Sequence, residues 1–307
     1  MLTVCNFHYI RPDFSKPYPS IFGVTPAEFD AQIKTLKKEG SFVTVKELAQ
    51  DIDAILQDNN NHLLITFDDG LQEQFELALP ILEQNQTEAL FFINSMNFLE
   101  NKVSMVHKIH LVRSVISPSD ILKAIRKNSF SPSAELTPME CSKAVGHYRY
   151  DDEATACLKY LLNFKLPQSS VELLINTLFE QNFEEQSVVS SLYMSNQQLQ
   201  YLAERQMLGN HTHSHLALGL LPQHQIEEEI LKTKSFIQNF KKNDNLAISY
   251  PYGSAEACQW PVTEMAKQTG HHLGFSMERG VNDVTADKLL LKRYSSNDLP
   301  GGKNYSS

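Results

Sequence analysis

Short apolar runs that alternate with helix-forming stretches constrain the fold of this chain more than any other feature. The runs are nearly continuous in hydrophobic residues, which is typical of strands buried on both faces of a parallel sheet. Strands that alternate with helices predict an α/β fold, either a parallel sheet covered on both faces or a closed barrel, with functional groups at the carboxyl ends of the strands. The predicted strands are residues 2–7, 62–67, 88–94, 245–250, 272–277 and 289–295.

Helix starts are marked by a capping Thr or Ser followed three residues later by Glu or Gln. Thr25 with Glu28 and Thr137 with Glu140 form two such pairs. A third start at Ser195 predicts a helix that ends at Gly209.

Residues 97–189 interrupt the strand–helix alternation. This segment has helical patterns at 106–115, 120–125, 157–162 and 171–179 and contains no convincing strand. We therefore predict an inserted helical subdomain, with the remaining fold formed by residues 1–96 and 190–307. The insertion leaves and re-enters the core near strand ends, so we expect it to form a lid or the contact of a homodimer.

Charge and cysteine usage limit the partners and the compartment. The 307 residues include 27 Lys and Arg against 36 Asp and Glu, a net charge of −9, which argues against a nucleic-acid partner. No stretch has the ~20 apolar residues of a transmembrane segment. Four scattered cysteines and an N-terminus that lacks a basic leader predict a reduced, cytoplasmic protein.

Two adjacent carboxylates, Asp68 and Asp69, follow the apolar run at 62–67 directly. Buried carboxylates are costly unless a cation pairs with them, and a metal ion would serve. Both can reach one site only if the strand ends there, and Gly70 permits that turn. The alternative is that Asp69 caps the helix that begins near Leu71.

Three alternate histidines, His211, His213 and His215, lie within five residues. If this stretch were one turn of helix, His211 and His215 would lie on one face and could bind one metal ion. A polar surface loop is the alternative. His211 and His213 also form an HxH pair, which could begin a metal site of the amidohydrolase type with His213 as a ligand, but no HxH occurs early in the chain.

The two motifs together resemble the polysaccharide deacetylase family, also called the NodB-homology or carbohydrate esterase 4 family. The similarity rests on TFDDG at 66–70, HTHSH at 211–215, the ALFFIN strand and SYPYG at 249–253. It covers roughly residues 1–97 and 190–296, and leaves out the helical segment.

This resemblance implies a distorted (β/α) barrel of the NodB-homology type that binds one divalent ion, with zinc as the default. The implied ligands are Asp69, His211 and His215. Asp68 would be the general base that deprotonates the attacking water, and Tyr252 would contact the substrate or its oxyanion.

The sequence departs from the family pattern in two places. The family often has an Arg shortly before the Pro-Tyr-Gly element, where this chain has residues 248–250, and a Leu-x-His near its end, where this chain has Leu291, Lys292 and Arg293. Arg293 could stabilise an oxyanion or orient Asp68, but it cannot donate a proton near neutral pH. His8, at the end of the first strand, is the candidate acid, although it could equally be bonded to nearby backbone.

We therefore expect a metal-dependent hydrolase of carbohydrate amides that removes an N-acetyl group from an amino sugar. A cytoplasmic location favours a nucleotide- or lipid-linked precursor of a surface glycan over a cell-wall polymer as the substrate. The alternatives are an N-formyl amino sugar deformylase and an inactive, sugar-binding member of the family.

Overall fold

The computed structural model of the chain describes residues 1–14, 23–127, 136–148, 151–240 and 247–305. The chain folds into two compact units. Unit 1 comprises Met1–Asp13, Phe22–Lys102 and Val189–Ser307, and unit 2 comprises Phe14–Ile21 and Val103–Val188.

A curved sheet forms the centre of unit 1, and each of its strand pairings is parallel. The strand order is β10-β1-β5-β6-β7-β8-β9, with β4 also paired to β5. A separate pair, β2 (Tyr9–Ile10) and β3 (Gly23–Val24), follows the first strand. The sheet strands are β1 (Leu2–Phe7), β4 (Ser41–Phe42), β5 (His62–Phe67), β6 (Ala89–Ile93), β7 (Leu208–Asn210), β8 (Ala247–Ser249), β9 (Leu273–Phe275) and β10 (Tyr294–Ser295).

One segment near the C-terminus connects the two edges of this sheet. Leu291 forms a parallel bridge with Phe275 of β9, and three residues later Tyr294 of β10 pairs with Cys5 of β1. The sheet is therefore curled on itself, which confirms the predicted distorted (β/α) barrel.

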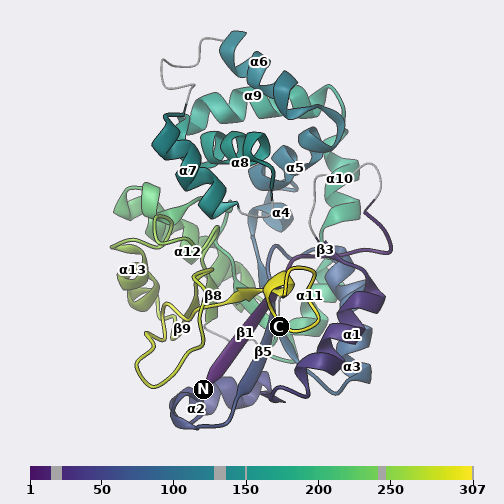
Figure 1. The fold of residues 1–307 in the computed structure, drawn as a ribbon, viewed down its shortest axis with the longest axis vertical. Helices are drawn as coiled ribbons and strands as arrows, with labels where there is room; N and C mark the ends of the chain where they lie inside the picture. The colour runs from purple at the N-terminus through teal and green to yellow at the C-terminus, as the bar shows by residue number, and fades with distance from the viewer. Residues whose placement is uncertain (15–22, 128–135, 149–150, 241–246, 306–307) are drawn as a thin grey trace. The chain divides into compact units, whose positions relative to one another are not determined.

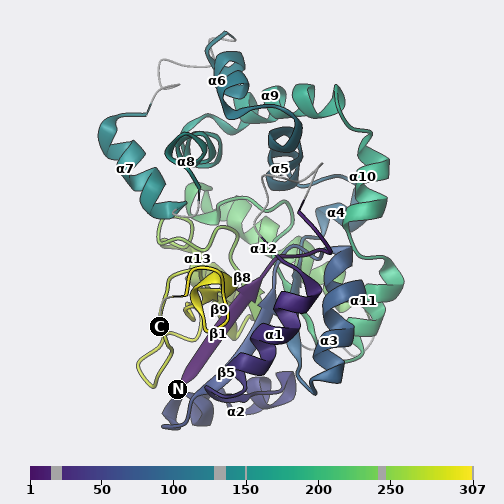
Figure 2. The same cartoon turned by 45° about the vertical axis from the view of Figure 1, so that its right-hand side comes forward.

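Helices cover the outside of the barrel. Figures 1 and 2 show α1, α3 and α11 along one side of the sheet and α12 and α13 along another. The capping boxes predicted at Thr25, Thr137 and Ser195 are all present. The helices of unit 1 are α1 (Pro26–Leu36), α2 (Val45–Gln57), α3 (Leu79–Gln84), α4 (Met96–Leu99), α11 (Asn196–Ala203), α12 (Gln223–Gln238) and α13 (Val262–Gln268).

The described residues of unit 2 form helices and loops without a strand. Helices occur at the four positions that the sequence pattern indicated, although α8 ends at Tyr160 and a π-helical turn, Leu161–Lys165, continues it. The helices are α5 (Met105–Val115), α6 (Pro118–Lys127), α7 (Pro138–His147), α8 (Glu153–Tyr160), α9 (Gln168–Glu180) and α10 (Glu185–Leu192), the last of which extends into unit 1.

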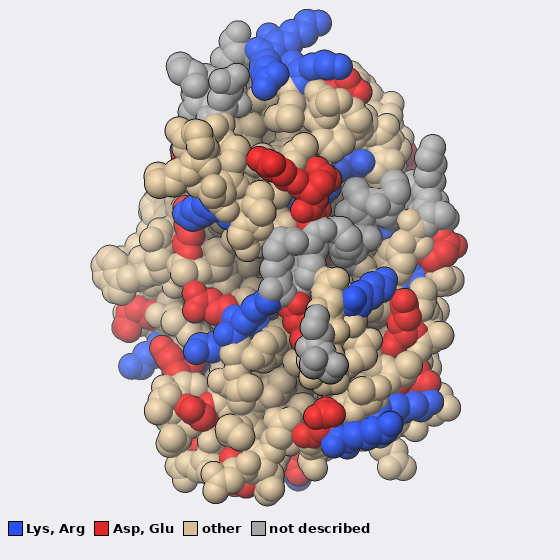
Figure 3. Space-filling model, viewed as in Figure 1, with Lys and Arg blue, Asp and Glu red and all other residues tan. Residues whose placement is uncertain are grey.

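Two further features are the lengths of the helices and the distribution of charged side chains. None of the helices in the described ranges is long and apolar enough to cross a membrane. Basic and acidic side chains are interspersed on the face shown in Figure 3.

The helix predicted from Ser195 to Gly209 is wrong in its second half. Helix α11 ends at Ala203, Gln206 has a φ of 60°, and Leu208–Asn210 forms strand β7 between β6 and β8. A strand of three residues is too short to show a strand pattern. The predicted strand at 289–295 is likewise reduced to β10, and residues 245–246 of the predicted strand at 245–250 lie outside the described residues.

Gly209 allows the close packing of β7 against its neighbour. A Cβ atom at this position would overlap ring carbons of the buried Phe92. We predict that Gly209→Ala lowers the free energy of unfolding by about 1–3 kcal/mol, the usual range for overpacking a core. Thermal unfolding followed by circular dichroism measures the effect.

Gly146→Ala is the matched control, because nothing lies within 4 Å of a Cβ atom built at this helical glycine. This variant should be neutral or slightly more stable, since Ala favours helix. If both variants unfolded at the wild-type temperature, the contact between Gly209 and Phe92 would not limit the packing of β7.

Candidate active site

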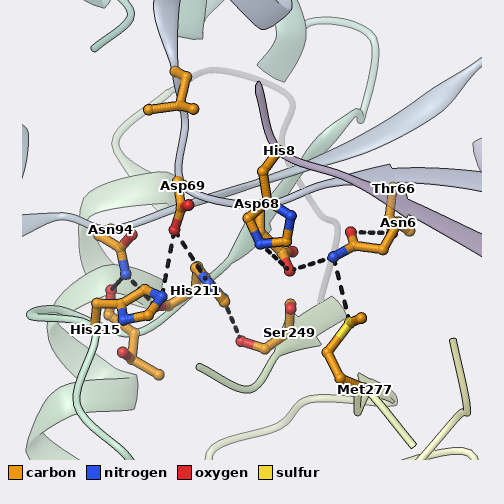
Figure 4. Close-up of polar contacts among 12 residues, drawn as sticks. Asn6, His8, Thr66, Asp68, Asp69, Asn94, His211, His215, Ser249 and Met277 are labelled. Carbon is orange, nitrogen blue, oxygen red and sulfur yellow. Dashed lines mark hydrogen bonds and ion pairs between the residues drawn. The ribbon is translucent and has the colours of Figure 1, made fainter. Parts of the chain in front are cut away.

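The chain turns sharply at the end of β5, where the two carboxylates lie. Strand β5 ends at Phe67, and the residues at 69 and 70 both have positive φ, 81° for Asp69 and 64° for Gly70. A helix N-cap has extended backbone angles, so Asp69 does not fit that alternative role. The turn places Asp68 and Asp69 side by side at the carboxyl edge of the sheet, in different surroundings (Figure 4).

Asp69 faces two imidazoles. Its Oδ1 lies 3.6 Å from His211 Nε2 and 3.4 Å from His215 Nε2, and all three side chains are buried. The ligand atoms of these three residues lie within 4.8 Å of one another. The structure thus brings together the three residues that the sequence nominated as metal ligands (Figure 4).

The protonation of His211 suits it to bind a cation. Its Nδ1 lies 2.7 Å from the carbonyl oxygen of Ser249, which can only accept a hydrogen bond, so Nδ1 carries the proton. Burial lowers the pKa of His211, which keeps the ring neutral. Nε2 therefore presents a lone pair towards the carboxylate of Asp69. Two acceptors in this position repel each other unless a cation lies between them, so the donor set fits a divalent metal ion.

The histidine motif forms a loop after β7 rather than a helical turn. Thr212 and His215 have positive φ values of 63° and 60°. The buried Asn94 amide donates to the carbonyl oxygens of His211 and Thr212, the latter at 3.3 Å. The expectation that a helix turn aligns the two imidazoles is therefore wrong, because the loop shape aligns them.

His213 faces away from the cluster. Its Nδ1 lies 2.8 Å from Ser95 Oγ and its Nε2 lies 2.9 Å from Glu100 Oε1. Ser214, the next residue, donates its backbone N–H to Glu229 of α12. The amidohydrolase interpretation, which required His213 as a metal ligand, does not fit this geometry. These contacts instead fix the loop that carries the two imidazoles facing Asp69.

Asp68 pairs with Arg293 through two parallel hydrogen bonds. Arg293 Nη1 donates to Oδ1 at 3.0 Å and Nη2 donates to Oδ2 at 2.9 Å, and the arginine is completely buried. Burial alone would raise the pKa of Asp68, but the Arg293 guanidinium and, to a smaller extent, His211 lower it well below its usual range. Asp68 is therefore ionised at neutral pH.

Polar residues of β1, β5 and β8 complete the hydrogen bonding around Asp68 and Arg293, and this role was not identified from the sequence. Asn6 donates to Asp68 Oδ2 at 2.9 Å and accepts from Thr66 and Arg293, while Ser249 Oγ accepts from Arg293 Nη2 at 2.8 Å. A signal was present, because Asn6 and Thr66 are polar residues near the carboxyl ends of otherwise apolar strands.

The last two candidate residues, His8 and Tyr252, lie next to Asp68 and His215, respectively. His8 is partly exposed, and its Nε2 lies 3.8 Å from Asp68 Oδ2. The Tyr252 ring packs edge-on against His215 with 5.1 Å between ring centroids, and its φ is 62°. Burial, with a smaller contribution from Asp69, raises the pKa of Tyr252, so its phenol stays protonated and can donate a hydrogen bond.

Comparisons with solved structures agree with this fold. A Streptococcus pyogenes deacetylase, PplD, in complex with acetate is 15% identical with a TM-score of 0.57, covering 96% of this chain and 91% of that one. IcaB from Ammonifex degensii is 16% identical with a TM-score of 0.53, over 96% and 91% of the two chains. A de-N-acetylase from Aggregatibacter actinomycetemcomitans is 13% identical with a TM-score of 0.53, and the match covers 96% of this chain and 95% of that one.

A comparison with curated proteins finds no match. The polysaccharide deacetylase family model, however, matches residues 56–130 and 171–274, which is more than half of the chain. The chain therefore belongs to the polysaccharide deacetylase family.

Proposed function

We propose that this protein is a metal-dependent hydrolase that removes an N-acetyl group from an amino sugar. The observation that carries the proposal is the buried cluster of Asp69, His211 and His215 directly beside the ionised carboxylate of Asp68. Two imidazoles and one carboxylate would hold a divalent ion, with zinc as the default choice. Such an ion, when bound, lowers the pKa of water and polarises an amide carbonyl.

Asp68 is the proposed general base. Its carboxylate stays ionised because Arg293 pairs with it, so it is ready to accept a proton at neutral pH. The hydrogen bonds from Arg293 and Asn6 also fix its orientation. Arg293 acts in this proposal as a positioning residue, because its guanidinium is completely buried and its Nε, Nη1 and Nη2 donate to Asp68 and to residues in or beside neighbouring strands.

His8 is the proposed acid that protonates the leaving amine. It lies beside Asp68 and is partly exposed, so a substrate could reach it. Tyr252, with its protonated phenol against His215, is the proposed contact for the substrate or its oxyanion.

The proposed site could hydrolyse the amide of either an N-acetyl or an N-formyl amino sugar. Acetate was bound in the Streptococcus pyogenes deacetylase structure, which supports the acetyl choice for this chain. The proposed substrate is an amino sugar in surface-glycan synthesis, in free, nucleotide-linked or lipid-linked form. A cytoplasmic location and a lid or dimer-forming role for residues 97–189 remain predictions.

Replacing His211 or His215 by Ala should abolish metal binding and acetate release together, because each supplies one of three ligands. Metal content is measured by elemental analysis after dialysis. Released acetate and formate are assayed with a panel of N-acetyl and N-formyl amino sugars, free and nucleotide-linked. His272→Ala, an exposed histidine at the opposite end of the sheet, is the control and should keep both properties.

Full metal occupancy in both variants would contradict the ligand assignment. A wild-type protein that binds metal but releases no acid from any sugar would instead support the inactive, sugar-binding alternative. Formate release without acetate release would identify a deformylase.

Asp68→Asn should keep the metal and lower kcat by about 10²- to 10⁴-fold, the usual contribution of general-base catalysis. The variant leaves the buried Arg293 without its carboxylate partner, so its thermal unfolding must be measured alongside metal content and kcat. Loss of the metal from a folded variant would mean that Asp68 is a ligand.

His8→Gln should lower kcat and remove the fall in activity at high pH, because an acid catalyst must be protonated to act. The measurement is a pH profile of kcat for the wild type and the variant, with metal content determined in parallel. A variant whose kcat stays within twofold of the wild type across the profile would exclude His8 as the acid.

A further inference from the structure

A cavity lies at the amino end of the barrel, the end opposite to the candidate active site. Its volume is about 630 Å³, which is within the range of cavities that bind small molecules. Ala247 and Leu273, the first residues of β8 and β9, pair with each other and line it. Helix α2 lies at the same end, next to the start of β1 (Figure 1), and also contributes to the walls. Asp69, His211 and His215 follow the carboxyl ends of β5 and β7, so the cavity is separate from them.

The walls of this cavity are largely apolar. Leu48 and Ile52 of α2 line one part of it, and Leu273 and Leu289 line another. Leu48 and Leu273 belong to the main hydrophobic core, whereas Leu289 packs against a second core cluster that includes residues of α12 and α13. The cavity therefore lies where two groups of core residues meet. A hydrocarbon or aromatic group that filled it would remove apolar surface from water on several sides.

Basic side chains predominate at this cavity. The ionisable residues that line it are Lys267, His271, His272, Asp287 and Lys288. Lys288 pairs with Asp53 at 2.7 Å, and the Asp287 carboxylate accepts the backbone N–H two residues later at 2.9 Å. Within the described ranges, no hydrogen bond or ion pair engages the ammonium group of Lys267. Lys267 can therefore pair with a ligand without giving up a partner in the protein.

His271 forms a fixed polar part of the wall. The Asn210 amide nitrogen, which can only donate, lies 3.1 Å from His271 Nε2, and Thr269 Oγ1 lies 3.1 Å from Nδ1. Burial, with a smaller contribution from the charge of Lys234, lowers the pKa of His271 to about 4, so the ring is neutral at neutral pH. A buried ring with both nitrogens bonded keeps its position when a ligand binds, which reduces the entropy lost on binding.

We propose that this cavity binds a small molecule with an apolar body and one anionic group, a carboxylate or a phosphate. The body packs against the apolar walls at Leu48, Ile52 and Leu273, and the anionic group pairs with Lys267. Burial of the body supplies most of the affinity, since each fully buried CH₂ group lowers Kd by about 4-fold. The site does not depend on the proposed function, because the candidate metal ligands and catalytic residues lie at the other end of the barrel.

The balance of charges distinguishes an anion from a cation or a neutral molecule. A cationic ligand would be repelled by Lys267 and Lys288, and the carboxylate of Asp287 already accepts a backbone hydrogen bond. A neutral ligand would use the apolar walls but not the ammonium group of Lys267. An anion uses both, so the expected order of affinity is anion, then neutral molecule, then cation.

Isothermal titration calorimetry of the full chain measures this order with octanoate, octyl phosphate, 1-octanol and octylammonium. We expect saturable binding of the two anions, with Kd values about 2- to 5-fold below that of 1-octanol, the usual effect of one exposed ion pair. Octylammonium should bind more weakly than 1-octanol. Butanoate, which lacks four of the CH₂ groups, should bind at least about 10-fold more weakly than octanoate.

Variants of the lining residues locate the binding. Lys267→Gln should remove the advantage of octanoate over 1-octanol and leave the Kd of 1-octanol unchanged, and Lys38→Gln, at an exposed lysine after α1, is its matched control. Ala49→Phe and Ala286→Phe place a ring at two positions that line the cavity, so each should raise every Kd by at least about 10-fold through overpacking. Ala31→Phe, at an exposed alanine of α1, should leave every Kd unchanged.

Equal affinity of octanoate for the wild type and for both Phe variants, each shown to be folded by circular dichroism, would overturn the proposal. The absence of saturable binding, or equal Kd values for octanoate, 1-octanol and octylammonium, would overturn it as well. His215→Ala should bind octanoate like the wild type, and loss of binding in this variant would mean that the carboxylate binds at the candidate metal site instead. Failure of the proposed function is a separate result, since these titrations measure neither acetate release nor metal content.

Discussion

The buried pair of Asp68 and Arg293 is the interaction on which both the barrel and the proposed chemistry depend. A carboxylate that leaves water must be paired, and removing one partner of such a pair costs about 3–5 kcal/mol. Arg293 also donates to the carbonyl of Ser276 and to the hydroxyl of Ser249, so one guanidinium connects the two edges of the curled sheet. The family pattern often supplies an arginine from just before the Pro-Tyr-Gly element, whereas this chain supplies one from just before its last strand.

Because Asp68 pairs with Arg293 and Asp69 does not, the two adjacent carboxylates have different surroundings. Asp68 receives hydrogen bonds from Arg293 and Asn6, which hold it ionised and fixed in orientation. Asp69 faces the Nε2 atoms of two histidines, of which that of His211 is unprotonated, and a divalent cation would stabilise this arrangement. A single positive-φ turn after β5 thus gives neighbouring residues two different environments, and different environments are what allow two carboxylates to perform different tasks.

Sequence patterns predicted the long apolar strands and the capped helices well, because burial on both faces and capping chemistry are local properties. They also predicted correctly that Asp68, Asp69 and the histidine motif lie at the carboxyl edge of the sheet, because parallel strands have their carboxyl ends at the same edge. They failed at β7, where three residues are too few to show a period, and in the shape of the histidine loop. They left two roles open for Arg293, orienting Asp68 or stabilising an oxyanion, because the choice depends on how the sheet closes and not on any local pattern.

The order of the strands has a consequence for biosynthesis. Asp68 and Arg293 are separated by 225 residues in the sequence, which corresponds to roughly 10–45 s of synthesis at about 5–20 residues per second. Throughout that interval the nascent chain carries the Asp68 carboxylate without its arginine. The proposed base can therefore be buried in its ionised form only when the last strand joins β1, so the folding step that closes the barrel is also the step that completes the site.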